Sequence, residues 1–149
     1  MKRIILTCIL VCSVFFCKAQ VVQYRFIETI SESQSEVTFK INVFCEDKEL
    51  LDHSAKLSAI RNVIFYGVDG TRFNKPLLDE SESSLVGKHK SYFESLYNTH
   101  YVDFIKDCSQ TSKFKKSGDG KSTTFQVTVK IFELRRHLEK NRIKTKFGI

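Results

Sequence analysis

A glycine-rich segment is the part of the sequence closest to a known chemical motif. Gly118-Asp119-Gly120-Lys121-Ser122 matches the end of a phosphate-binding loop, in which backbone N–H groups and a lysine bind phosphates. The full motif needs a glycine five residues before Gly120, where this chain has Lys115, and a helix after it. Alternating apolar residues follow instead and predict a strand. Because Asp-Gly favours tight turns, we predict a hairpin turn here and no phosphate site.

Two further groups of residues could do chemistry. His89 lies on the same predicted helix face as Tyr92 and Phe93, which could form an acid–base or ligand cluster, but a histidine there is more often simply packed. The acidic run 46–49 with Asp52 could bind calcium, yet it lacks the glycine and ligand spacing of a calcium loop. The four histidines show no metal-ligand spacing. The sequence therefore predicts no catalytic, cofactor-binding or metal-binding residue.

The N-terminus predicts where the protein acts. Lys2 and Arg3 precede a 13-residue apolar run, and Ala19 provides the small residue that signal peptidase prefers. The run is short of the about 20 residues that span a bilayer, and the large residue Phe16 before Cys17 does not suit lipoprotein processing. We expect a signal peptide at 1–19, cleavage before Gln20, and a periplasmic or secreted single domain at 20–149 with no transmembrane segment.

Two cysteines remain after removal of residues 1–19. Cys45 and Cys108 are an even pair in an oxidising compartment, so they could form a disulfide. The alternative is two buried free thiols, because free cysteine packs as a small hydrophobe. Cys108 could also be a nucleophile with one of the histidines, but a thiol with a potential disulfide partner is a poor candidate.

Basic residues gather in the C-terminal part. Residues 20–110 carry 10 basic and 14 acidic side chains, whereas residues 111–149 carry 11 basic and 3 acidic. Arg142, Lys144 and Lys146 are therefore candidate contacts with an anionic envelope surface made of lipid, lipopolysaccharide or acidic glycan. The alternative is a solvated helix face and tail. Lys113-Phe114-Lys115-Lys116 could suggest nucleic-acid binding, but export makes that partner unsuitable.

The apolar periodicity predicts the elements that position these residues. Alternation over 22–30 and 37–45 predicts a hairpin, and the spacing of Leu57, Ile60 and Ile64 predicts a helix that Asp52 could cap and Gly67 could end. A loop reaches residue 78, and a second helix follows Ser83 or Ser84. An extended segment from residue 101, a return strand over 125–131 and a helix over 132–140 complete the chain.

The element order is thus ββ-α-α-ββ-α. Such an order favours an α+β domain, in which helices cover one face of an antiparallel sheet of about four strands.

The segment from Ala59 to Gly70, with Lys75-Pro76-Leu77-Leu78 after it, resembles a family of uncharacterised exported Bacteroidetes proteins. Tyr92-Phe93, the run 101–105 and the run 134–139 extend this resemblance over most of the mature chain. At the level of fold, the chain also resembles periplasmic accessory domains of flagellar assembly and curli secretion, which act as interaction modules.

These observations lead to an expected function. We expect an exported, non-enzymatic binding or assembly accessory of the bacterial cell envelope, with an envelope protein or an anionic surface as partner. A small secreted hydrolase or glycan-active enzyme, and a secreted factor acting on foreign molecules, are the alternatives.

Overall fold

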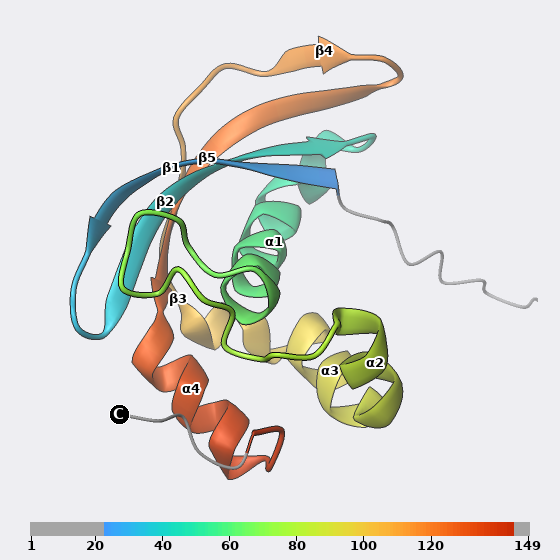
Figure 1. Ribbon diagram of the computed structural model, residues 1–149. Coiled ribbons are helices and arrows are strands. Elements are labelled where there is room, and N and C mark those ends of the chain that lie inside the picture. Colours follow the sequence, from blue (N-terminus) through green and yellow to red (C-terminus); the bar gives the residue numbers. More distant parts are fainter. Residues whose placement is uncertain (1–22, 145–149) are drawn as a thin grey trace, which may run out of the picture.

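An antiparallel sheet with all helices on one side organises the structure (Figure 1). The computed structural model describes residues 23–144, so the expected signal peptide, its cleavage site and Lys146 lie outside the described residues. The strands are β1 (Gln23–Glu32), β2 (Glu36–Cys45), β3 (Ile105–Gln110), β4 (Lys115–Ser117) and β5 (Gly120–Lys130). Their order is β1-β2-β5-β3, and β4 also pairs with β5. The predicted α+β class is confirmed, with five strands where about four were expected.

The core forms because apolar side chains alternate along the two central strands. Every second residue of β2 from Val37 to Cys45 is buried, and the same holds for β5 from Thr123 to Val129. Side chains at alternate positions of a strand point to the same face. The long helix α1 (Leu51–Phe65) packs against this face of both strands. The hairpin and the return strand predicted from the sequence are therefore confirmed.

The turn before β5 is the predicted hairpin turn. Gly118 and Asp119 connect β4 to β5, Gly118 has φ +58°, and Ser117 pairs with Gly120. A strand follows the turn where a phosphate-binding loop would need a helix.

Helix α1 begins differently from the prediction. A short 3-10 turn, η1 (Lys48–Leu50), precedes it, and Asp47 caps that turn by accepting a hydrogen bond from Glu49 N at 2.9 Å. Asp52 lies inside the first turn of α1, where Lys56 Nζ donates to its carboxylate at 2.6 Å. The prediction of an Asp52 cap is therefore wrong, because the backbone already turns five residues earlier.

The chain folds back under the C-terminal end of α1. Gly67 has φ +81° and ends the helix region, as predicted. The last carbonyls of a helix have no partner within the helix. Here Leu77 N donates to Val63 O at 3.4 Å and Leu78 N donates to Ile64 O at 3.0 Å. The returning loop thus satisfies groups that would otherwise be buried without a partner.

The second predicted helix is two helices. The chain forms α2 (Glu82–Lys88) and α3 (Lys90–Asn98), with a break at His89, where φ is −125° and ψ is 43°. Gly87, which has low helix propensity, stands two residues before the break. The segment from residue 101 also differs from the prediction, because it forms a 3-10 turn, η2 (His100–Phe104), before β3 begins.

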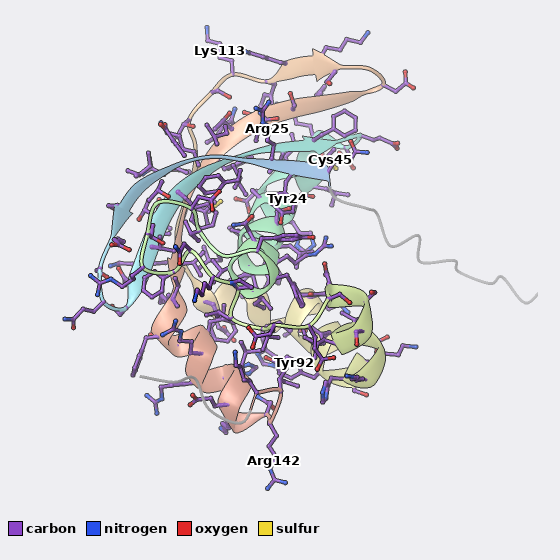
Figure 2. The ribbon with its side chains drawn as sticks, in the orientation of Figure 1. Tyr24, Arg25, Cys45, Tyr92, Lys113 and Arg142 are labelled. Atoms are coloured by element: carbon purple, nitrogen blue, oxygen red, sulfur yellow. The ribbon has the colours of Figure 1, made fainter. Side chains whose placement is uncertain are left out.

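The last helix, α4 (Ile131–Lys140), ends in a Schellman motif, a hydrogen-bonded turn with one left-handed residue. Arg142 has φ +58°, Arg142 N donates to Glu139 O, and Ile143 N donates to Leu138 O. Ile143 then packs against the core. Arg142 is exposed, and Figure 2 shows its side chain pointing away from the body of the protein.

Replacing Arg142 by glycine is expected to stabilise the fold. A residue with a Cβ pays about 1 kcal/mol in the left-handed region, and glycine does not. We expect the R142G variant to gain about that much free energy of unfolding, measured by urea denaturation. The matched control is R136G in the middle of α4, which should lose about 1 kcal/mol because glycine disfavours a helix interior. A loss in both variants would contradict the left-handed cap.

Candidate functional site

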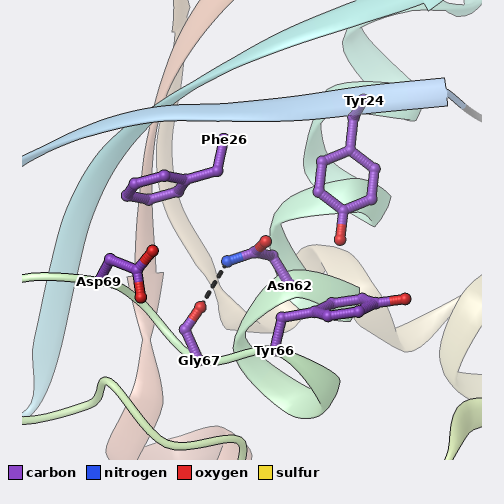
Figure 3. Close-up of a pocket in the computed structure, with 6 residues that line it drawn as sticks. All are labelled: Tyr24, Phe26, Asn62, Tyr66, Gly67 and Asp69. Atoms are coloured by element: carbon purple, nitrogen blue, oxygen red, sulfur yellow. Dashed lines mark hydrogen bonds between the residues drawn. The ribbon is translucent and has the colours of Figure 1, made fainter.

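A pocket of about 360 Å³ lies between the edge strand β1 and the end of α1 (Figure 3). We call it the β1–α1 pocket. Two of its residues come from β1, one from the last turn of α1, and three from the segment that follows the helix, which begins with the capping residue Tyr66. They are Tyr24, Phe26, Asn62, Tyr66, Gly67 and Asp69.

Strand register and helix spacing bring these side chains together. Tyr24 pairs with Val43, and Phe26 pairs with Ile41, so both rings share the face of the sheet that α1 covers. Asn62 is in the last turn of α1 and Tyr66 caps it four residues later, where Tyr66 N still donates to Asn62 O at 2.9 Å, so both lie on one side of the helix end.

The loop that completes the pocket is fixed to β1. Thr29 Oγ1 donates a hydrogen bond to Asp69 O at 2.6 Å, and Glu32 Oε2 accepts one from Arg72 N at 2.9 Å. These two bonds hold the loop from Gly67 onward against the edge strand. The position of Asp69 at the pocket is thus set by the hydrogen bond to its own carbonyl and by the bond at Arg72, three residues later.

Asn62 is the most informative residue of the pocket. Its side chain is buried, with 5% of the residue exposed, and Nδ2 donates to Gly67 O at 2.7 Å. No described residue donates a hydrogen bond to its Oδ1. Figure 3 shows this oxygen pointing between Phe26 and Tyr24, into the pocket. This oxygen is not among the buried atoms that lack a partner, so it is open to the pocket and available to accept a hydrogen bond from outside the chain.

The aromatic residues give the pocket an apolar lining with polar tips. Burial raises the pKa of Tyr24, and the neighbouring Tyr66 raises it further, so Tyr24 keeps its hydroxyl proton. The Phe26 ring packs on Phe39 with 5.9 Å between centroids. Tyr66 is 62% exposed and stands at the rim. The lining can therefore contact an apolar surface while its hydroxyl groups form hydrogen bonds.

A charged network lies beside the pocket. Arg61 donates from Nε to Glu82 Oε1 at 2.8 Å and from Nη2 to Oε2 at 2.7 Å, while the Tyr97 hydroxyl donates to Oε1 at 3.0 Å. Burial acts to lower the pKa of Arg61, but the bond and charge of Glu82 outweigh it, so the pKa is raised. The network joins α1 to α2 and α3 with both charges satisfied.

Cys45 and Cys108 form no disulfide with each other and do not lie together. Cys45 pairs with Lys121 and Cys108 with Val127, on opposite sides of β5. Six residues along a strand span about 20 Å, far beyond the about 7 Å that a disulfide allows. The disulfide considered from the sequence is therefore not formed: both cysteines lie on the buried face of the sheet, but they pair with positions six residues apart on β5.

Cys108 is also not activated as a nucleophile. Burial raises the pKa of its thiol to about 12, and the charge of Asp52 adds to this effect. The thiol therefore stays protonated at neutral pH, whereas the thiolate is the nucleophilic form.

Three of the four histidines, His53, His100 and His137, have a tyrosine or aspartate partner. The Tyr92 hydroxyl lies 2.9 Å from His137 Nδ1 on α4, while the Tyr92 ring contacts Phe93 with 5.2 Å between centroids. His53 lies 2.7 Å from the Tyr101 hydroxyl. Burial lowers the pKa of His137, with the charge of His100 contributing. In residues 23–144, no group of three or more histidine, cysteine or acidic residues could hold a metal ion.

The structure separates the three expected anion contacts. Arg142 is exposed, whereas Lys144 Nζ donates to Leu77 O at 2.9 Å and to Asp79 Oδ2 at 3.1 Å. Lys146 lies outside the described residues. Lys113, Lys115, Lys116 and Lys121 near the β4–β5 turn are also exposed. Figure 2 shows Lys113 and Arg142 at opposite ends of the molecule.

Sequence reasoning missed the β1–α1 pocket. Its signals were present as the alternation of Tyr24 with Phe26 and the four-residue spacing of Asn62 with Tyr66, but each also fits a simple core. Within the described part of the chain, no helix is long and apolar enough to cross a membrane. Comparisons with family models, curated proteins and solved structures found no significant match to this chain.

Proposed function

We propose that the mature chain is an exported, non-enzymatic binding module of the bacterial cell envelope, whose ligand occupies the β1–α1 pocket. The observation that carries this proposal is Oδ1 of Asn62, an acceptor that no described residue uses and that points into a pocket lined by aromatic rings. Ligand sites combine apolar lining with a few fixed polar groups. Asn62, Asp69 and the Tyr24 hydroxyl supply such groups here.

The glycan-active enzyme is the weaker alternative. Hydrolysis of a glycosidic bond generally uses two carboxyl groups that face the bond from either side. Asp69 is the one carboxylate among the six residues that line the pocket. Glu82 is bound by Arg61 and Tyr97, which leaves it poorly suited to act as an acid. This arrangement supports binding over cleavage.

The placement at the envelope rests on the sequence. The charged start, the short apolar run and Ala19 support export, and the basic C-terminal part supports an anionic surface as partner. Arg142 is the exposed member of the proposed contact, and Lys144 would first have to leave Asp79.

Binding at the pocket can be tested by NMR titration of the isotope-labelled mature chain. The probes are amino acids, dicarboxylates, nucleosides and disaccharides, each added separately. We expect at least one class to shift the Asn62 side-chain amide and the Tyr24 ring signals. The Y66A variant, altered at an exposed rim residue, should weaken these shifts by at least tenfold in affinity.

The matched control is F132A on α4, because Phe132 is also an exposed aromatic residue and lies outside the pocket. It should bind as the unchanged chain does. An absence of shifts for every probe, or equal affinity in Y66A, would overturn the proposed pocket function.

A further inference from the structure

We infer that the β1–α1 pocket binds an uncharged sugar, as a free saccharide or as a unit of a longer glycan. This inference rests on the proposed binding function and names the ligand class for the same pocket.

The rim offers a stacking surface. Tyr66 is 62% exposed and is part of the lining, so one ligand can contact its ring and the interior together. A sugar ring has a face of C–H groups, and the electron-rich face of an aromatic ring attracts such a surface. Tyr24 and Phe26 project from β1 across the pocket from Tyr66 (Figure 3). The ligand that fits has an apolar face and a polar edge.

The interior is rich in hydrogen-bond acceptors. Asn62 Oδ1 is an acceptor without a donor among the described residues, and the Asp69 carboxylate adds two acceptor oxygens. The Tyr24 hydroxyl can donate as well as accept, and its raised pKa keeps the proton in place. Sugar hydroxyl groups on neighbouring carbons donate in pairs, which matches several acceptors better than a ligand made of acceptors alone.

The charge of the lining argues against anionic ligands. None of the six lining residues is a lysine or arginine, and Asp69 is acidic. Arg61 is next to this region, but Glu82 binds it through two hydrogen bonds. A carboxylate or phosphate on the ligand would face Asp69 without a free cation in the lining. An uncharged sugar avoids this repulsion.

The size is suitable for one or two sugar rings. The volume of about 360 Å³ lies near the lower end of the about 300–1,000 Å³ typical of small-molecule pockets. The exposed Tyr66 at the rim leaves room for a ligand that continues beyond the pocket.

The experiment is isothermal titration calorimetry of the mature chain, supported by the NMR shifts described above. The neutral probes are N,N′-diacetylchitobiose, cellobiose, maltose and glucose. The charged probes are glucuronic acid and glucose 6-phosphate, which match glucose in ring size. We expect binding of at least one neutral saccharide, and at least tenfold weaker binding of glucuronic acid and glucose 6-phosphate than of glucose.

Three variants test the roles of the residues. Y66F keeps the ring and should stay within threefold of the unchanged chain, whereas Y66A should lose at least tenfold. D69N, at an exposed position, should reduce the ratio of the glucose affinity to the glucuronic acid affinity by at least threefold. Equal affinity of Y66A and Y66F, or of neutral and charged sugars, would overturn the inference.

The outcomes also separate this inference from the proposed function. If an amino acid or nucleoside shifts the Asn62 signal and no saccharide does, the inference of a sugar ligand is wrong while the proposed binding function remains supported. No shift with any probe would overturn both.

Discussion

Replacing Gly67 by alanine is expected to lower the free energy of unfolding by about 3 kcal/mol. Gly67 has φ +81°, a conformation that costs a residue with a Cβ about 1–2 kcal/mol. A Cβ at this position would also stand 2.6 Å from Asn74 O and 2.8 Å from Lys75 C. These are backbone atoms, and forcing extra volume into a packed region typically costs about 1–3 kcal/mol. The two effects act together, and urea denaturation of G67A measures their sum.

Gly70 provides the matched control. It has φ +76°, almost the same as Gly67, but a Cβ there would meet no atom within 4 Å. The G70A variant should therefore lose about 1 kcal/mol from the backbone conformation alone. The difference between the two variants reports the close approach of the loop to Gly67. Equal losses in G67A and G70A would contradict that close packing.

G67A should also affect the pocket. Gly67 O accepts the Nδ2 hydrogen bond of Asn62, which orients the amide so that Oδ1 points inward. A displaced backbone at Gly67 would release this amide. We therefore expect G67A to lose ligand binding even at temperatures where it remains folded, whereas G70A should bind normally.

The sequence could predict the faces of the strands and some of the turns, because these depend on local periodicity. Val37, Phe39 and Ile41 alternate without interruption, and their burial follows from the two-residue period of a strand. The Asp-Gly turn and the end of α1 at Gly67 depend on backbone preferences of single residues.

The sequence could not predict contacts between distant segments, because these depend on which strands become neighbours in the sheet. Cys45 and Cys108 both belong to buried faces, yet the order β1-β2-β5-β3 puts β5 between their strands. Lys144 belongs to a basic C-terminal segment that reads as a solvated tail. The Schellman turn at Arg142 instead directs Lys144 to Asp79, 65 residues earlier. Such long-range pairings leave no periodic signal in the chain.

The pocket belongs to the same class of features. Tyr24 and Asn62 are separated by a strand and most of a helix, and they meet because β1 is the edge strand over the end of α1. The break at His89 is similar, since the apolar spacing of Leu85, Phe93 and Leu96 is compatible with one helix or two. In each case, tertiary packing decides between local alternatives.

Replacing Glu82 by glutamine is expected to lower the free energy of unfolding by about 2 kcal/mol. Glu82 and Arg61 retain 20% and 25% exposure of their side chains, and the Tyr97 hydroxyl shares the same carboxylate. Removing one partner of a fully buried pair costs about 3–5 kcal/mol, and partial exposure to water reduces that cost. The variant leaves the Arg61 charge half-buried without an acid beside it. Urea denaturation of E82Q provides the measurement.

E94Q is the matched control for this substitution. Lys90 and Glu94 form an ion pair of 3.7 Å within α3, with 75% and 59% of their side chains exposed. Exposed pairs of this kind contribute about 0.5 kcal/mol or less. A loss in E82Q no larger than that in E94Q would mean that the Arg61–Glu82 pair behaves as a surface pair and does not hold α2 against α1.

A spectroscopic titration tests the same substitution at the pocket. Burial is the main cause of the raised pKa of Tyr24; the charge of Glu82 raises it further and that of Arg61 lowers it. In E82Q burial and Tyr66 still raise the pKa of Tyr24, but the increase from Glu82 is lost while Arg61 still lowers it. The pKa of Tyr24 should therefore fall, as should that of Tyr97, which loses its ionised partner. Tyrosinate absorbance should therefore appear at lower pH in E82Q and stay unchanged in E94Q.

E82Q should also change which sugars bind, because Arg61 would then act as an unpaired cation beside the pocket. The affinity for glucuronic acid relative to that for glucose should therefore rise in E82Q. An unchanged ratio of the two affinities would mean that the preference for uncharged sugars does not depend on this pair.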